Sequence, residues 1–72
     1  MVLNYKPLIQ AKIKEFYEKL PDYSFGNILY SALSVKFKNK DFKKGDIFAL
    51  NDEEVYEILS KSLMIELKSL EE

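Results

Sequence analysis

Apolar residues recur every three or four positions in three parts of the chain, and polar or proline-containing stretches separate these parts. Residues 5–20 set one face of a helix with Ile9, Ile13, Phe16, Tyr17 and Leu20. Residues 25–36 do the same with Phe25, Ile28, Leu29, Ala32 and Leu33. Residues 52–70 carry the longest stripe, formed by Val55, Ile58, Leu59, Ser62, Leu63, Leu67 and Leu70. The pattern predicts a small all-α domain with three helices.

Residues that favour helix ends stand at the borders of these stripes. Pro21 follows the first stripe, and Ser24 precedes the second with Asn27 three positions on, a weak form of a capping box. Asn51 and Glu54 form a stronger capping box before the third stripe. Because the first link is short, we expect the first two helices to form an antiparallel hairpin that the longer third helix crosses.

The stretch between the second and third stripes follows no helical period. Residues 37–46 are rich in lysine and contain a Gly-Asp pair, which predicts a loop. Apolar and polar residues also alternate over 35–38, and together with the apolar residues 47–50 this alternation allows a short β-like hairpin instead.

Composition narrows the classes of function. The chain has 72 residues, 47% of them hydrophobic, and a formal net charge of −1, which fits one small domain spanning 1–72. It has no histidine, cysteine or arginine, and it has only two glycines. Histidine and cysteine catalysis, thiolate metal sites and glycine-rich phosphate loops are therefore excluded. We predict a protein that is not an enzyme and that uses no cofactor or metal.

The third predicted helix carries more apolar residues than one inner face can bury. Around its end they occupy the whole circumference, so we expect a protein partner or self-association to cover the surplus. The predicted function is that of a protein-binding accessory or inhibitor-type factor. The candidate contact residues are Tyr56, Met64, Ile65, Leu67 and Leu70.

The lysine-rich loop supports an alternative function. Lysines interleaved with an aromatic residue can follow a phosphate backbone and stack unpaired bases, although the missing arginines and the near-neutral charge weigh against this. The candidate nucleic-acid contacts are Lys36, Lys38, Lys40, Phe42, Lys43 and Lys44.

Two segments, PDYSFGNIL (21–29) and DIFALNDEEVYEIL (46–59), resemble a group of small uncharacterised helical proteins of bacteria and phages. The shared pattern is Pro-Asp, then Phe-Gly-Gln before an apolar helix, then Asp-x-Phe before a helix with an acidic cap. Asn27 replaces the glutamine here. The resemblance implies a compact helical fold and a phage or prophage setting, and it implies no activity. The matching residues are Pro21, Asp22, Phe25, Gly26, Asp46, Phe48 and Asp52.

The chain shows no sign of export or membrane insertion. Its first residues lack the apolar segment of a signal peptide, and no apolar run approaches the roughly 18 residues of a membrane span. We therefore expect no membrane partner and a cytoplasmic location, in a bacterial cytosol or a phage-infected host.

Gly26 falls at the second position of the predicted second helix, where a glycine lowers helix propensity. We expect its missing side chain to let another segment approach the helix closely, most simply the end of the first helix or the segment that carries Phe48.

Overall fold

The structure is a computed structural model, and the part of the protein that it describes contains four helices. That part is residues 4–37 and 43–71, without the side chains of Lys44 and Glu71. Within it no residue is in a strand, which confirms the all-α fold. The helices are α1 (Lys6–Lys19), α2 (Phe25–Lys36), α3 (Lys44–Phe48) and α4 (Asp52–Glu71).

The two predicted capping boxes begin α2 and α4. In α2, Ser24 Oγ accepts a hydrogen bond from the Asn27 amide at 3.2 Å, and Asn27 Oδ1 accepts one from the Ser24 amide at 3.0 Å. In α4, Asn51 Oδ1 accepts from the Glu54 amide at 2.8 Å. These side chains satisfy amides that have no partner inside the helix, so the predicted starts are confirmed.

The prediction of three helices misses α3. The loop expected over 37–46 gives way to a helix at residue 44, and the β-like segment expected at 47–50 is wrong because that helix includes 47 and 48. Asp46 explains the start, since its carboxylate accepts a hydrogen bond from the Lys43 amide at 3.1 Å.

The other half of the predicted β-like hairpin is also wrong. Residues 35 and 36 are the last two of α2, and residue 38 lies outside the described residues. A short alternation of apolar and polar residues does not separate a strand from the end of an amphipathic helix, and here the helical period of α2 prevails.

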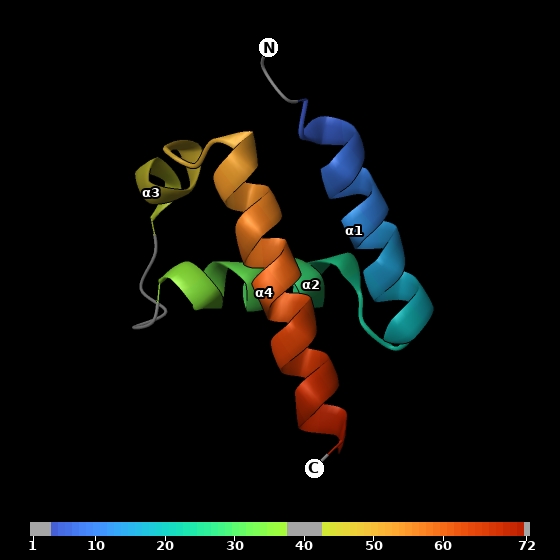
Figure 1. The fold of residues 1–72 in the computed structure, drawn as a ribbon. Helices are drawn as coiled ribbons and strands as arrows, with labels where there is room; N and C mark the ends of the chain where they lie inside the picture. The colour runs from blue at the N-terminus through green and yellow to red at the C-terminus, as the bar shows by residue number, and fades with distance from the viewer. Residues whose placement is uncertain (1–3, 38–42, 72) are drawn as a thin grey trace.

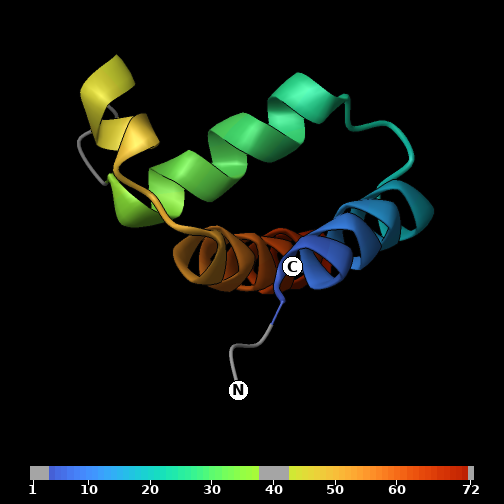
Figure 2. The ribbon, with the colours of Figure 1, turned by 90° about the horizontal axis from the view of Figure 1, so that it is seen from above.

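Helix α4 lies at the centre of the fold. In Figure 1 it runs beside α1 in the same direction, while α2 crosses behind, and Figure 2 shows α1 and α4 in one layer with α2 above them. The shortest extent of the molecule is 18 Å, as expected for two layers of helices.

The predicted hairpin therefore differs from the observed packing. Helices α1 and α2 diverge after their short link, and both make their main contacts with α4. The reason is that α4, with 20 residues, offers an apolar stripe long enough for both.

The core is small and draws on three helices. Phe16 and Ile28 are fully buried, and Ser62 of α4 is buried with them. Several predicted inner positions are partly exposed instead, because two layers cannot cover them: Tyr17, Phe25, Leu29 and Leu70. The buried apolar residues are Phe16, Leu20, Ile28, Ala32, Leu33, Ile58, Leu59 and Leu63.

The close approach expected at Gly26 is wrong. A β-carbon placed on Gly26 would meet only Ser24 Oγ, at 3.7 Å, which is an ordinary van der Waals contact. Phe48 is 74% exposed and does not pack on this residue. Gly26 is therefore not required by packing.

Candidate functional site

Three of the five candidate contact residues on α4 are exposed. The exposed fraction is 72% for Met64, 56% for Ile65 and 69% for Leu70. Leu70 continues the inner stripe of α4 and is exposed, and the end of α4 runs past the crossing with α2 (Figure 1). The term α4 patch is used below for Met64, Ile65 and Leu70.

The other two candidates have contacts inside the domain. Leu67 is half-buried and packs against the core. The ring of Tyr56 lies 5.8 Å from that of Tyr5, and Lys12 Nζ lies 6.0 Å from its centroid. Both distances fall within the range of weak ring and cation–π contacts, so Tyr56 helps to hold α4 against α1.

The candidate nucleic-acid contacts are only partly described. Lys36 Nζ lies 2.5 Å from Glu54 Oε2 and so joins the end of α2 to the start of α4. This hydrogen bond lowers the pKa of Glu54, and the hydrogen bond from the Asn51 amide lowers it further by a smaller amount. Lys43 is exposed before α3, the Lys44 side chain is not described, and Lys38, Lys40 and Phe42 lie outside the described residues.

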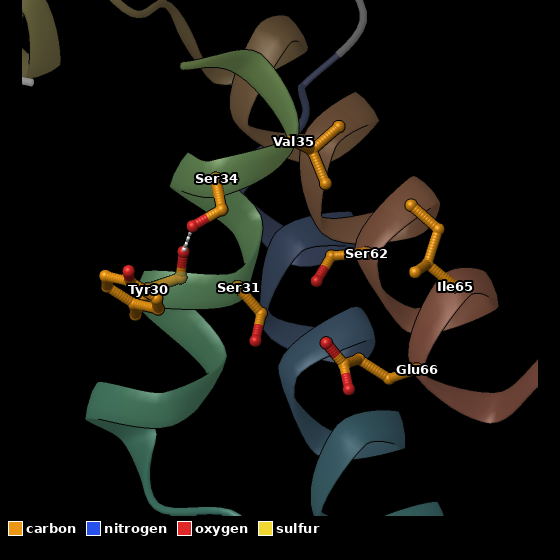
Figure 3. Close-up of a pocket in the computed structure, with 7 residues that line it drawn as sticks. All are labelled: Tyr30, Ser31, Ser34, Val35, Ser62, Ile65 and Glu66. Atoms are coloured by element: carbon orange, nitrogen blue, oxygen red, sulfur yellow. Dashed lines mark hydrogen bonds between the residues drawn. The ribbon is translucent and has the colours of Figure 1, made fainter. Parts of the chain in front are cut away.

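A cleft of about 260 Å³ opens between α2 and α4. Ser31 and Val35 of α2 face Ser62 and Glu66 of α4, and Figure 3 shows the two serine hydroxyls and the carboxylate pointing into the same space. Ile65 forms the apolar wall beside Ser62. The cleft thus joins a polar floor to one residue of the α4 patch.

Ser62 is the least expected member of this cleft. Its side chain is 1% exposed, and its hydroxyl has no hydrogen-bond partner among the described residues. By contrast, Ser34 donates to the Tyr30 carbonyl at 2.8 Å, and Ser60 donates to the Tyr56 carbonyl at 2.9 Å. A buried hydroxyl without a partner is unfavourable and points to an external group.

Glu66 is held by a residue that does not line the cleft. The Tyr23 phenol donates a hydrogen bond to Glu66 Oε2 at 2.5 Å. This bond to the carboxylate, together with partial burial, raises the pKa of Tyr23 above its ordinary value of 10.0. The phenol therefore stays protonated and holds the carboxylate in place at neutral pH.

A second cavity, of about 210 Å³, lies between the two layers of helices. Residues of all four helices line it, together with Leu50 of the link before α4. Half-exposed Phe25 and Leu29 belong to its lining, all of which is apolar. The lining comprises Ile9, Ile13, Phe25, Ile28, Leu29, Ala32, Leu33, Ile47, Leu50, Val55, Ile58 and Leu59.

The sequence pattern places Ser62 on the inner face of the third predicted helix and indicates no role for Ser62 or Glu66. The signal was a serine inside an apolar stripe with a glutamate one turn later. The facing residue, Ser31, is 31 positions away in the sequence, so the period of a single helix does not reveal the cleft.

The described residues contain neither a membrane-spanning helix nor an acidic metal site. No helix among them is both long and apolar enough to cross a membrane. No three acidic side chains in the described ranges come together in a way that could hold a metal ion.

Comparisons with known proteins give no match. No protein-family model matches the chain, and neither the curated proteins nor the solved structures contain a significant counterpart.

Proposed function

We propose that the protein is a non-enzymatic accessory or inhibitor-type factor that acts by binding another protein chain through the α4 patch. The observation that carries this proposal is the exposure of Met64, Ile65 and Leu70 on the longest helix of the domain. At about 100° per residue, Met64 and Ile65 are neighbours on the surface of α4, while Leu70 lies about 120° or more around the axis from both. The contiguous apolar surface that is typical of interaction sites is therefore formed by Met64 and Ile65. A 72-residue domain also has a small core, so contact with a second chain adds burial that the fold lacks.

The charges around the α4 patch indicate the kind of partner. Helical spacing places Lys61 and Lys68 on the same side of α4 as Met64 and Ile65, and both lysines are exposed. The partner surface that fits best has an apolar centre and an acidic rim. A second copy of the chain or a different protein can supply it. The proposed bacterial or phage origin rests on the resemblance carried by residues 21–29 and 46–59.

The proposal is tested with Met64→Lys and Ile65→Lys, which add charge where the wild-type side chain is already exposed. Light scattering after size exclusion measures self-association, and capture from a bacterial lysate measures binding of a different protein. Both variants are expected to keep the helical circular dichroism and the thermal midpoint of the wild type while they lose the complex. Gln10→Lys on exposed α1 is the matched control and is expected to keep it.

A strictly monomeric wild type, together with variants that capture the same proteins as the wild type, would contradict the proposal. The nucleic-acid function would be favoured instead if the protein shifted single-stranded DNA or RNA in a gel at low salt and the double variant Lys40→Glu with Lys43→Glu did not. Lys36, the first lysine of that set, already pairs with Glu54 and does not strengthen this alternative.

A further inference from the structure

The cleft between α2 and α4 has the features of a site for a small positively charged group. Its floor combines a buried hydroxyl, Ser62, with a half-buried carboxylate, Glu66, and the hydroxyl of Ser31 points into the same space (Figure 3). All three groups can accept a hydrogen bond. A group that donates several hydrogen bonds can therefore satisfy all three together.

Glu66 differs from the other half-buried acidic residues because it lacks an ion pair with a described lysine. Three acidic residues are half-buried within the described ranges, namely Glu15, Glu54 and Glu66. Glu15 pairs with Lys12 and Lys19, at 3.0 and 3.1 Å, and Glu54 pairs with Lys36. Glu66 has the Tyr23 phenol, and it has no ion pair with any described lysine. A bound cation lowers the free energy of a partly buried carboxylate that has no cationic partner, because it adds a charge-assisted hydrogen bond.

The shape and volume of the cleft limit the kind of ligand that fits. Beside the polar floor, Val35 and Ile65 provide an apolar wall (Figure 3). The volume of about 260 Å³ is near the lower limit of ligand pockets, which favours a small head on a short apolar stem over a large cofactor.

From the acceptors, the carboxylate without an ion pair and the apolar wall, we infer that the cleft between α2 and α4 binds a primary ammonium group on an aliphatic stem. The ammonium lies against Ser62 and Glu66, to which it donates hydrogen bonds, and the stem lies along Val35 and Ile65. An ammonium has three donors, which matches the acceptors that converge here. Such a group belongs either to a free small amine or to a lysine side chain of another protein. The inference does not depend on the proposed function.

The test is a titration of the full chain, followed by two-dimensional amide NMR. The probes are n-butylammonium for a free amine and Nα-acetyl-lysine-methylamide for a lysine side chain. Tetramethylammonium has the charge without N–H donors, and n-butanol has the stem without the charge. Binding of either primary ammonium probe at residues 31, 35, 62 and 66, with the two control compounds much weaker, supports the inference. The tighter of the two probes then identifies the source.

Two variants separate a binding role from a structural one. Glu66→Gln removes the charge, and Ser62→Ala removes the buried hydroxyl, so each is expected to weaken amine binding by about ten-fold or more, as expected for hydrogen bonds to a charged group. Ser62→Ala is also expected to leave the unfolding midpoint unchanged or to raise it, because it deletes a hydroxyl without a described partner. The matched control is Ser60→Ala, whose hydroxyl lies outside the cleft and binds the Tyr56 carbonyl.

Three results would overturn the inference. The first is the absence of shifts with both primary ammonium probes. The second is equal binding of tetramethylammonium, since this would show charge attraction without hydrogen bonding. The third is a Ser62→Ala variant that binds amine like the wild type or unfolds at a clearly lower denaturant concentration, because Ser62 would then act only within the fold.

Discussion

The phenol of Tyr23 donates a hydrogen bond to a carboxylate oxygen of Glu66 that is 43 residues away along the chain and 2.5 Å away in space. Tyr23 lies in the link between α1 and α2, and Glu66 lies in the second half of α4. Both side chains are half-buried, so water competes with the bond less than it does at the surface. This contact fixes the link to the central helix and holds the carboxylate at the edge of the cleft.

Tyr23→Phe removes the hydroxyl and keeps the ring. We expect the free energy of unfolding to fall by about 1 kcal/mol, because a hydrogen bond to a charged group is lost at a partly exposed site. Urea denaturation followed by circular dichroism measures the change. Tyr17→Phe is the control, since Tyr17 is 43% exposed, and it is expected to stay within roughly 0.5 kcal/mol of the wild type. Equal stability of the two variants would show that the Tyr23 bond adds nothing.

The same bond predicts an alkaline transition. The pKa of Tyr23 is raised in the folded protein, so the stability that the bond adds is present below the ordinary tyrosine pKa of 10.0 and is lost as the pH rises through the folded-state value. Ultraviolet titration of the phenols is expected to show one of the five tyrosines ionising later than the rest. Tyr23→Phe is expected to remove that late step. A late step that survives in this variant would belong to another tyrosine.

The lowered pKa of Glu54 predicts that stability is lost as the pH falls, whereas the stability from Tyr23 is lost as the pH rises. Its pKa is lowered below 4.5, so its contribution to stability is present above pH 4.5 and is lost as the pH falls through the folded-state value. Glu54→Gln is therefore expected to be less stable than the wild type at neutral pH, and this difference is expected to close at low pH. Thermal unfolding at a series of pH values measures it, with exposed Glu53→Gln as the control. A difference that does not depend on pH would mean that charge pairing with Lys36 contributes nothing.

Gly26→Ala is expected to stabilise the protein. The new methyl group meets only Ser24 Oγ at 3.7 Å, and alanine exceeds glycine in helix propensity by up to about 1 kcal/mol. Because the site is at the second position of α2, we expect a gain of roughly 0.5 kcal/mol, measured by chemical denaturation. Destabilisation would restore the packing role that the sequence indicated for this glycine.

The apolar cavity between the layers predicts a stabilising substitution. Ala32 is 2% exposed and lines the cavity of about 210 Å³, so Ala32→Leu places apolar atoms in empty space. Cavity filling of this kind commonly adds about 0.5–2 kcal/mol. Ala11→Leu at an exposed position of α1 is the control and is expected to change stability little. A loss of stability in Ala32→Leu alone would show that the layers are already packed at this point.

The sequence predicted what depends on local signals. Periodicity and capping residues place α1, α2 and α4 within one residue of their observed ends, because a stripe such as Ile28, Ala32 and Leu33 reports directly on burial. Helix α3 was missed because its five residues are too few to show a period. The hairpin was wrong because a link length fixes how near two helix ends lie, while the faces that pack decide their crossing.

The same division holds for the candidate site. Exposure of Met64 and Ile65 follows from an excess of apolar residues on one helix, and sequence alone reveals that excess. The half-burial of Leu67 and the contacts of Tyr56 depend on where α1 and α2 meet α4, which the sequence does not state. The cleft at Ser62 depends on the same crossing.

The central place of α4 has a consequence for synthesis. Helices α1 and α2 pack mainly on α4 and little on each other, yet both are translated before it. Their buried faces, with Phe16 and Ile28, therefore have no docking surface until α4 has left the ribosome. The nascent chain should expose apolar surface until then and complete its fold in one late step. A mutation that delays α4 would increase capture by chaperones before it changes the stability of the finished protein.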